Sequence, residues 1–409
     1  MPKPCVIGIS THGGYYAMEF AAWSEIDIDA LRRNVARTRS IVGPDVKTLL
    51  TIKADAYGHG APRVARAATS EGIDMLGVAT LHEGIELRCA GVQVPILILS
   101  PSLVSEIDEI LEWDLSPTVS DMRFARALSF SASRSRTVRV HVEIDTGMTR
   151  AGVNQDEACD FLRTLSGLSG IEVEGLYTHF PSTHDEDSEY MENQVCAFQS
   201  IVETLRAEGL EFPLRHTANS AAIVQHPGSH FNMVRPGGMI YGMFPSPGLN
   251  GVGLEPVMSF RSRVVNVKDV KKGKTVSYGR THRFDRDSRV AAVAVGYGHG
   301  FPRSLSNTGD LLVKGKRAPI VGMVTMDVTL MDVSDIPGVV VGDEVMIFGK
   351  QGDDEITVYE IAERCNTISY EITCGIGKRV PRVYIAEGRI TGIVTLVGER
   401  LPKAGISLI

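Results

Sequence analysis

The sequence lacks several features that would assign a protein to a class at once. It has no apolar run near the roughly 20 residues that a bilayer-spanning helix needs. Its formal net charge of −7 gives no general attraction to nucleic acid or to anionic membranes. Six cysteines are scattered through 409 residues without a CxxC pair, which indicates reduced thiols and predicts neither a disulfide framework nor a metal site. We read residues 1–21 as an N-terminal extension without a signal-peptide core, so we expect a cytoplasmic protein.

A regular alternation of β-rich and helical segments begins near residue 25. A helical or turn segment follows each of the β-rich runs. The eight runs are 48–53, 74–79, 94–99, 115–119, 138–144, 173–180, 214–218 and 231–236. Eight such repeats within one domain predict a (β/α)8 barrel over residues 22–256. A doubly wound open sheet is the alternative, but the count of eight favours the barrel.

The pattern changes near residue 256. Most later segments are β-rich and are joined by short turns of Gly, Asp and Lys, with little helical periodicity. We therefore expect a mainly β domain over residues 257–388, followed by a C-terminal extension over 389–409. The fold class predicted is α/β, as a barrel followed by this β domain.

Polar residues stand at the ends of five predicted barrel strands. They are Lys53, Arg150, His179, the pair Asn219 and Ser220, and Arg235. Catalytic groups of such barrels gather at the carboxyl ends of the strands. Each residue has an ordinary explanation, because a lysine at a strand end is most often a solvated surface group and a single histidine is more often a core residue. Several together at one end of the barrel indicate a site.

The chemistry of these residues is consistent with a phosphate-bearing aldehyde cofactor. Partial burial of Lys53 would lower the pKa of its amine and make a neutral nucleophile available. Gly237 and Gly238 follow Arg235 and Pro236 directly, and their backbone could approach phosphate oxygens closely. The hydroxyl of Ser220 could bind the same anion. These residues predict an imine-forming lysine at one end of the cofactor and a phosphate site at the other.

Ten motifs together resemble the alanine racemases, and they keep the order and spacing of that family. The motifs are KADAYGHG, DTGMTRAG, THF, HTANSAA, MVRPGGMIYG, VSYGRT, GYGHGFPR, VTMD, TISYEI and KRVPRVY. The resemblance runs from about Ala22 to about Tyr384. It implies a pyridoxal-5'-phosphate-dependent isomerase with a barrel and a β-rich C-terminal domain. The implied reaction interconverts L-alanine and D-alanine and supplies D-alanine for peptidoglycan precursors.

The resemblance also implies a role for each matching residue. Lys53 would hold the cofactor covalently and act as a base on one face of the substrate, and Tyr278 would act on the other face. The implied cofactor contacts are Lys53, Tyr57, His179, Asn219, Ser220, Arg235, Gly237, Gly238 and Tyr370. The implied substrate contacts are Arg150 and the backbone of Met326, with Tyr297 and Asp327 at the entrance.

Tyr278 comes from the second subunit in this family, so the resemblance implies a head-to-tail homodimer. A tyrosine has an ordinary pKa near 10, and it needs positive neighbours to act as a base. His179 and Arg280 are the candidates for those neighbours. The resemblance implies no partner beyond the amino-acid substrate and the second subunit, and neither nucleic acid nor a membrane.

Four positions depart from the family's pattern. Glu143 stands where a lysine that can be carbamylated is common, and we expect its carboxylate to orient Arg150 directly. His299, Gly238 and Met323 replace an aspartate, a bulkier aliphatic residue and an arginine. These departures keep a racemase of serine or of several small amino acids open. A non-catalytic pyridoxal-phosphate carrier would lack the β domain, and a barrel decarboxylase would carry a Cys-Glu-Pro-Gly-Arg stretch that is absent here.

Overall fold

The computed structural model describes residues 20–132, 137–182, 188–243 and 251–400. The chain forms two compact units, one of residues 30–255 and one that combines residues 1–29 with residues 256–409. The N-terminal extension expected over residues 1–21 therefore lies almost wholly outside the described residues. Five cysteines within the described part are free thiols: Cys89, Cys159, Cys196, Cys365 and Cys374.

The first unit is a closed barrel of eight parallel strands, as predicted. The strands are β2 (Lys47–Thr51), β3 (Met75–Val78), β4 (Ile96–Pro101), β5 (Ser116–Val119), β6 (Val138–Asp145), β8 (Ile171–Tyr177), β9 (Leu214–His216) and β10 (Met233–Val234). The hydrogen-bonded order is β5-β4-β3-β2-β10-β9-β8-β6, and the pairing of β5 with β6 closes the ring. All eight coincide with the β-rich runs of the sequence, which excludes the open sheet.

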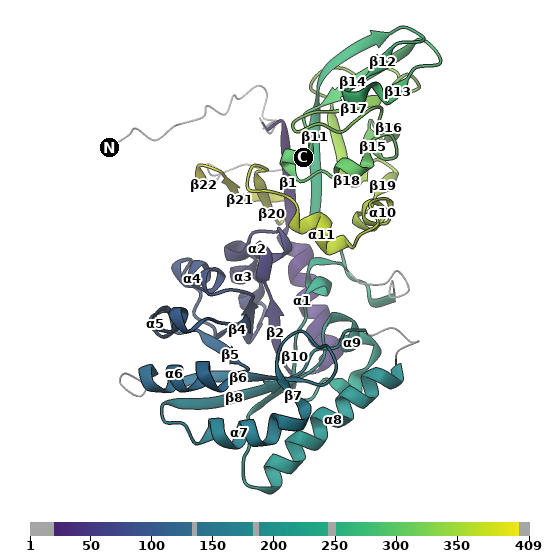
Figure 1. The fold of residues 1–409 in the computed structure, drawn as a ribbon. Coiled ribbons are helices and arrows are strands. Elements are labelled where there is room, and N and C mark those ends of the chain that lie inside the picture. Colours follow the sequence, from purple (N-terminus) through teal and green to yellow (C-terminus); the bar gives the residue numbers. More distant parts are fainter. Residues whose placement is uncertain (1–19, 133–136, 183–187, 244–250, 401–409) are drawn as a thin grey trace, which may run out of the picture. The chain divides into compact units, whose positions relative to one another are not determined.

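Helices surround this barrel in the usual alternation (Figure 1). They are α1 (Ile28–Val42), α2 (Lys53–Tyr57), α3 (Ala61–Ser70), α4 (Leu81–Cys89), α5 (Ile107–Glu112), α6 (Met122–Ala132), α7 (Ala158–Ser166), α8 (Ser188–Ala207) and α9 (Ser220–Gln225). A two-residue strand, β7 (Val153–Asn154), extends the sheet beside β6.

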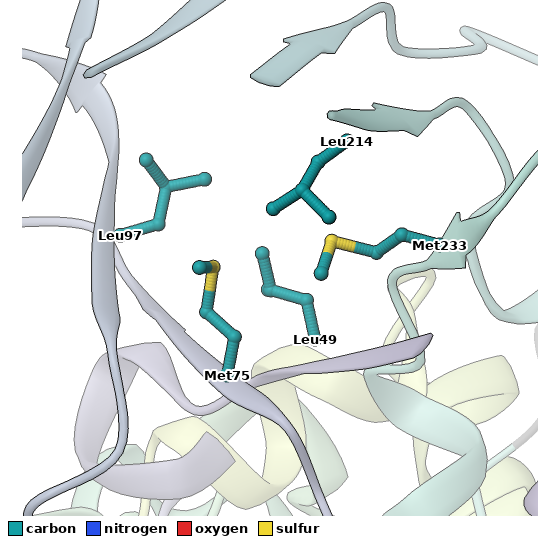
Figure 2. Packing of buried hydrophobic residues seen from close by; sticks show 5 residues of the cluster. All are labelled: Leu49, Met75, Leu97, Leu214 and Met233. Carbon is teal, nitrogen blue, oxygen red and sulfur yellow. The ribbon is translucent and has the colours of Figure 1, made fainter. Parts of the chain in front are cut away.

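One layer of the barrel interior is filled by apolar side chains from five strands. Leu49, Met75, Leu97, Leu214 and Met233 are each at most 5% exposed and converge on one another (Figure 2). A barrel interior packed in this way is a core rather than a channel. The polar residues of the site therefore have to lie at the strand ends.

The second unit is built around an 11-stranded sheet. Its strands are β1 (Ala22–Asp27), β11 (Met258–Val270), β14 (Ser288–Val293), β15 (Asp310–Val313), β16 (Lys316–Pro319), β17 (Thr329–Asp332), β18 (Glu344–Gln351), β19 (Asp354–Ile356), β20 (Arg382–Ala386), β21 (Arg389–Thr395) and β22 (Gly398–Arg400). A hairpin of β12 (Thr275–Val276) and β13 (His282–Arg283) and two helices, α10 (Val358–Arg364) and α11 (Ser369–Cys374), complete it. The prediction of a mainly β second domain is confirmed.

The unit boundaries differ from the expected domains at both ends of the chain. Residues 22–27, which we placed in the barrel, form β1 of the second unit's sheet, antiparallel to β11 and parallel to β20. Trp23 is 1% exposed and packs with Val383 and Ile390. Residues 389–400, which we placed in an extension, form β21 and β22 of the same sheet. Apolar burial of Trp23 and Ile390 explains why these segments join the sheet.

Candidate active site

Lys53 follows β2 with only Ile52 between them, and the four residues after Lys53 adopt a conformation that is rare for residues other than glycine. Ala54, Asp55, Ala56 and Tyr57 all have φ between 53° and 55°. The ψ angles of the first three lie between 46° and 51°, so these residues form a turn of left-handed helix. Each such residue costs about 1–2 kcal/mol relative to the right-handed form. Surrounding contacts must therefore hold this turn.

The turn brings Tyr57 close to the backbone that follows β10. A Cβ atom added at Gly237 would lie 3.0 Å from the hydroxyl oxygen of Tyr57. The Ser220 hydroxyl accepts a hydrogen bond from the Gly237 amide at 2.8 Å. Asn219 caps α9 by accepting from the amides of the second and third residues after it. Tyr57, Ser220 and Gly237, three of the residues predicted to bind phosphate, are thus brought together in the barrel unit.

Arg235 is only 5% exposed and donates hydrogen bonds in several directions. Its guanidinium donates to the carbonyl oxygens of His216 at 2.6 Å, Thr178 at 2.7 Å and Thr217 at 3.1 Å. It also donates to Nδ1 of His216 at 3.0 Å and to Nδ1 of His179 at 3.4 Å. Burial lowers the pKa of Arg235 to about 10, so the group stays charged at neutral pH.

A line of buried side chains continues from Arg235 across the barrel. Because arginine only donates, Nδ1 of His216 accepts, and the proton of that neutral imidazole is on Nε2. Nε2 of His216 lies 2.9 Å from Nδ1 of His141, which must therefore accept. Nε2 of His141 lies 3.4 Å from a carboxylate oxygen of Glu174. Both histidines are fully buried, and burial lowers the pKa of each.

We did not predict His141, Glu174 or Tyr177 from the sequence. Tyr177 stacks on the His216 ring at 4.9 Å, and Arg235 lies 5.1 Å from the centre of the Tyr177 ring. The available signal was a histidine inside each of two apolar strands, VRVHVEI and LRHTA. Such a residue is usually a satisfied core histidine, and only the pairing of the two shows that they act together.

His179 is half-buried two residues after the end of β8, and its Nδ1 atom accepts from Arg235. Burial, reinforced by Arg235, Arg150 and Lys53, lowers the pKa of His179 to about 3. The imidazole is therefore neutral at physiological pH. A neutral His179 supplies no positive charge, which favours Arg280 over His179 as the positive neighbour that we considered for a tyrosine base.

Glu143 and Arg150 are not directly paired in this structure. Glu143 is 4% exposed and accepts a hydrogen bond from the Tyr177 hydroxyl at 3.4 Å. Arg150 is exposed, and no ion pair within 4.0 Å joins it to Glu143. Burial raises the pKa of Glu143, and the charges of Arg235 and Arg150 oppose that rise. The expected direct contact is absent, and an electrostatic influence between Glu143 and Arg150 remains.

The loop that carries Arg150 is held by other groups. A carboxylate oxygen of Asp145 accepts from the amides of Gly147 at 2.9 Å and Thr149 at 3.0 Å. The Tyr190 hydroxyl of α8 donates to the carbonyl oxygen of Gly147 at 3.0 Å. A side chain at Gly147 would collide with Tyr190, which explains the glycine of DTGM.

In the second unit, Tyr278 lies on an exposed turn between β12 and β13. Its side chain is 74% exposed. The residue before it, Ser277, has φ of 60°, and its hydroxyl donates to the carbonyl oxygen of Met323 at 2.7 Å. The guanidinium of Arg280, which we considered as a neighbour of Tyr278, donates to the Thr275 hydroxyl at 2.9 Å. The second unit thus presents Tyr278 on a fixed turn.

The GYGHG and VTMD motifs of the second unit pack on each other. The amide of Tyr297 donates to Thr325 at 3.0 Å, and the amide of Gly298 donates to the carbonyl oxygen of Met326 at 2.9 Å. Gly296 has to be glycine, because a Cβ would lie 2.1 Å from the Thr325 carbonyl oxygen. These contacts bring Met326, a predicted substrate contact, together with the predicted entrance residues Tyr297 and Asp327 on one surface of this unit.

Asp327, His299 and Tyr370 lie in the same unit. Asp327 forms an ion pair with Arg379 at 2.6 Å, and both side chains are about half exposed. His299 accepts from the Gly296 amide at 3.3 Å, and burial followed by the charge of Arg379 lowers its pKa. Tyr370 is half-buried on α11, where burial raises the pKa of its hydroxyl.

Within the described ranges, no group of three or more His, Cys, Asp or Glu side chains could hold a metal ion. Among the helices that the structure describes, none is both long enough and apolar enough to cross a membrane.

The barrel, with charged and polar groups at the carboxyl ends of its strands, defines an enzyme of the (β/α)8 class. The family model of the alanine racemase N-terminal domain matches residues 26–245, and that of the alanine racemase C-terminal domain matches residues 257–384. The chain therefore belongs to the alanine racemase family and is an amino-acid racemase, an isomerase.

Individual relatives agree with this assignment. An alanine racemase of Halothermothrix orenii is 43% identical over 364 residues, which is 88% of this chain and 96% of that protein. The solved alanine racemase of Clostridium difficile 630 is 34% identical, with a TM-score of 0.88 over 93% of this chain and 99% of that one. The alanine racemase of Bacillus anthracis, solved with bound L-Ala-P, is 36% identical with the same TM-score and coverage.

Proposed function

We propose that the chain interconverts L-alanine and D-alanine with pyridoxal 5'-phosphate as cofactor. The observation that carries the proposal is the convergence of Tyr57, Ser220 and Gly237 near the turn that begins at Lys53. A Cβ at Gly237 would fill this space, so the glycine keeps room for a ligand beside two hydroxyl groups. This arrangement fits a phosphate at one end and an amine that reacts with an aldehyde at the other.

The remaining cofactor residues have consistent roles in this proposal. Gly238, Asn219 and Tyr370 would complete the phosphate site, and His179 would pack against the ring. Arg235 stays charged at neutral pH and would donate to the ring nitrogen without transferring its proton, so that nitrogen stays unprotonated. The bound group would delocalise the negative charge that develops at the substrate Cα atom.

Two bases on opposite faces of the substrate would move the proton. The Nζ atom of Lys53 would remove or return the Cα proton on one face, and the hydroxyl oxygen of Tyr278 would do so on the other. Arg150 and the backbone amide of Met326 would bind the substrate carboxylate, because a guanidinium fork suits two carboxylate oxygens. Tyr297 and Asp327 would line the entrance. Glu143 would steady Arg150 by its charge rather than by direct contact.

We further propose a head-to-tail homodimer in which Tyr278 of one copy completes the site of the other. The exposure of Tyr278 on the second unit's surface supports this arrangement, since an aromatic side chain 74% exposed has much apolar area available for a partner. The proposed setting is the cytoplasm, where D-alanine would be supplied for peptidoglycan precursors.

The reaction is tested by incubating the purified protein with L-alanine in D2O. We expect deuterium at Cα together with loss of optical rotation, because each proton that is returned comes from solvent-exchanged groups. Lys53→Ala should lose both signals and the absorbance of the bound cofactor. A panel that includes L-serine tests the substrate, and absence of Cα deuteration with every amino acid would refute the proposal.

The dimer is tested by mixing two inactive variants, Lys53→Ala and Tyr278→Phe. Each homodimer has two damaged sites, whereas a mixed dimer has one site with both bases intact. Random exchange of subunits should restore about a quarter of the wild-type activity. No recovery, with subunit exchange verified by mass spectrometry of differently tagged chains, would show that both bases come from one copy.

A further inference from the structure

The side chain of Glu83, on α4, is bonded to the turn that carries Lys53. One carboxylate oxygen accepts from the Ala54 amide at 2.7 Å. The other accepts from the amides of Ala79 at 2.7 Å and Thr80 at 3.2 Å. A single carboxylate therefore joins the residue after Lys53 to the end of β3. In the sequence alone Glu83 is only the third helical residue after Thr80, which is a helix-capping position.

The position of this contact matters because the turn is strained. Ala54 is the first of the four consecutive left-handed residues, and it directly follows Lys53. The chain is anchored before the turn by β2 and after it by the contacts of Tyr57, so a right-handed or extended backbone at Ala54 would have to be absorbed by a shift of Lys53 or of Tyr57. At the far end of the turn, Nδ1 of His59 donates to the carbonyl oxygens of Ala56 at 2.9 Å and Tyr57 at 3.0 Å. Glu83 is the side chain that holds the beginning.

We propose that Glu83 is a positioning residue for Lys53, and that its carboxylate keeps the left-handed turn in place so that the amine is fixed at the reacting centre. This inference rests on the proposed role of Lys53 as the cofactor-binding base. Charge-assisted hydrogen bonds to backbone amides are short and strong, which suits a contact that has to resist strain. A displacement of about 1 Å at a reacting group can cost a factor of about 100 in rate.

Glu83→Gln is the most direct test, because the amide has the same shape but only one acceptor oxygen. Its NH2 group would face a backbone N–H, so one side of the bridge is lost. We expect kcat of the holoenzyme to fall about 10- to 100-fold with KM changed less than about twofold. Hydrogen exchange at the amides of residues 54–58 should become faster in the same variant.

Relief of the backbone strain at Ala54 should restore the kcat that is lost when Glu83→Gln breaks the bridge. Glycine adopts the left-handed conformation without the cost that a side chain imposes, and the Ala54 side chain is exposed, so Ala54→Gly removes little packing. Ala54→Gly combined with Glu83→Gln should therefore recover most of the lost kcat and slow the exchange again. In the wild-type background Ala54→Gly should leave kcat nearly unchanged.

Two controls separate positioning from general destabilisation. Thr80→Ala removes the other half of the helix cap, in which the Thr80 hydroxyl accepts from the Glu83 amide at 3.4 Å, and leaves the bond to Ala54 intact. It should lower stability without accelerating exchange at residues 54–58. Lys314 has φ of 52° in the other unit, so Lys314→Gly relieves comparable strain elsewhere and should not rescue Glu83→Gln.

Unchanged exchange at residues 54–58 in Glu83→Gln, or equal rescue by Lys314→Gly and Ala54→Gly, would overturn the proposal. The exchange measurement does not depend on catalysis. Faster exchange in Glu83→Gln, with no Cα deuteration by the wild-type enzyme, would therefore reject the proposed function and keep the role of Glu83 in holding the turn.

Discussion

At the scale of single residues, Arg235 shows how much one buried side chain organises. Its guanidinium reaches three carbonyl oxygens and two imidazoles at the ends of two strands, β8 and β9. The number and directions of these acceptors match the planar fork of arginine and not the single ammonium of lysine. The proton positions on His216 and His141 follow from this one donor.

Arg235→Lys should therefore be destabilising although it conserves charge. A lysine cannot satisfy all the carbonyl groups that Arg235 now satisfies, and each buried acceptor left unpaired costs about 1–3 kcal/mol. We expect urea unfolding to show a loss of about 2–4 kcal/mol. Arg163→Lys is the control, since its ion pairs are on the surface with the arginine 41% exposed, and it should change stability by less than about 0.5 kcal/mol. Equal losses in both variants would contradict this account.

The sequence indicated the residues at strand ends but not their partners. Lys53, Ser220 and Arg235 were predicted because each follows an apolar run, and strand ends of a barrel meet at one face. Glu83 and Glu174 were not predicted, because a glutamate on a helix or at a strand surface is usually solvated. Their importance depends on which atoms lie beside them, and only the folded backbone determines that.

At the scale of elements, β8 allows contact between strands that are not neighbours. Gly175 on β8 pairs with His141 on β6 and with Leu214 on β9. Because Gly175 has no side chain, the His141 ring crosses over β8 and reaches His216 on β9. A Cβ at Gly175 would lie 2.4 Å from Nδ1 of His141, which is closer than nonbonded atoms can approach.

Gly175→Ala should thus displace His141 and break its bond to His216. Overpacking of this kind typically costs about 1–3 kcal/mol, and we expect a loss of that size in denaturant unfolding. Gly228→Ala is the matched control, because nothing lies within 4 Å of a Cβ at that position. The account fails if the two variants have the same stability, or if a crystal structure of Gly175→Ala keeps His141 on His216.

The left-handed conformation of the turn at residues 53–57 could not be predicted from the sequence. KADAY contains two alanines, which favour right-handed helix, and nothing in its composition calls for left-handed residues. Its conformation is determined by hydrogen bonds with residues outside the segment, notably Glu83 and Ile52. Local propensity was overridden at the position where the reactive lysine lies, as expected of functional sites.

At the scale of the whole molecule, the buried histidines predict acid sensitivity. His141 and His216 are fully buried, and their pKa values are lowered, so they are neutral when folded and bind protons when unfolded below about pH 6.5. Above about pH 6.5 these two histidines should therefore leave the free energy of unfolding independent of pH. At lower pH each should decrease it by up to about 1.4 kcal/mol per pH unit.

The raised pKa of Glu143 has the opposite effect on stability, because Glu143 binds a proton more readily in the folded protein than in the unfolded chain. Because acid lowers the stability through two histidines and raises it through one glutamate, we expect the free energy of unfolding to decrease as the pH falls. Denaturant unfolding at a series of pH values measures this loss. His141→Asn should reduce the slope between about pH 4 and 6, and a slope that does not change would show that His141 does not contribute.

The overall fold was predictable because eight β-rich runs alternate with helical or turn segments. The membership of β1 was not. Residues 22–27 form a short strand, and nothing in AWSEID distinguishes a barrel strand from a strand of the other sheet. The choice depends on β11 and β20, and the Ser24 hydroxyl donates to the Pro381 carbonyl oxygen across 357 residues. Contacts so far apart leave no local pattern.

This placement of β1 has a consequence for biosynthesis. The chain emerges from the ribosome N-terminus first, at about 5–20 residues per second, and domains generally fold as units. The barrel of residues 30–255 is complete before β11 is made, whereas β1 has its parallel partner β20 only when residue 386 has been translated. Until then the Trp23 side chain lacks Val383 and Ile390, against which it packs, so the nascent enzyme exposes this large aromatic side chain for most of its synthesis. Chaperone binding to that strand is the expected outcome during translation.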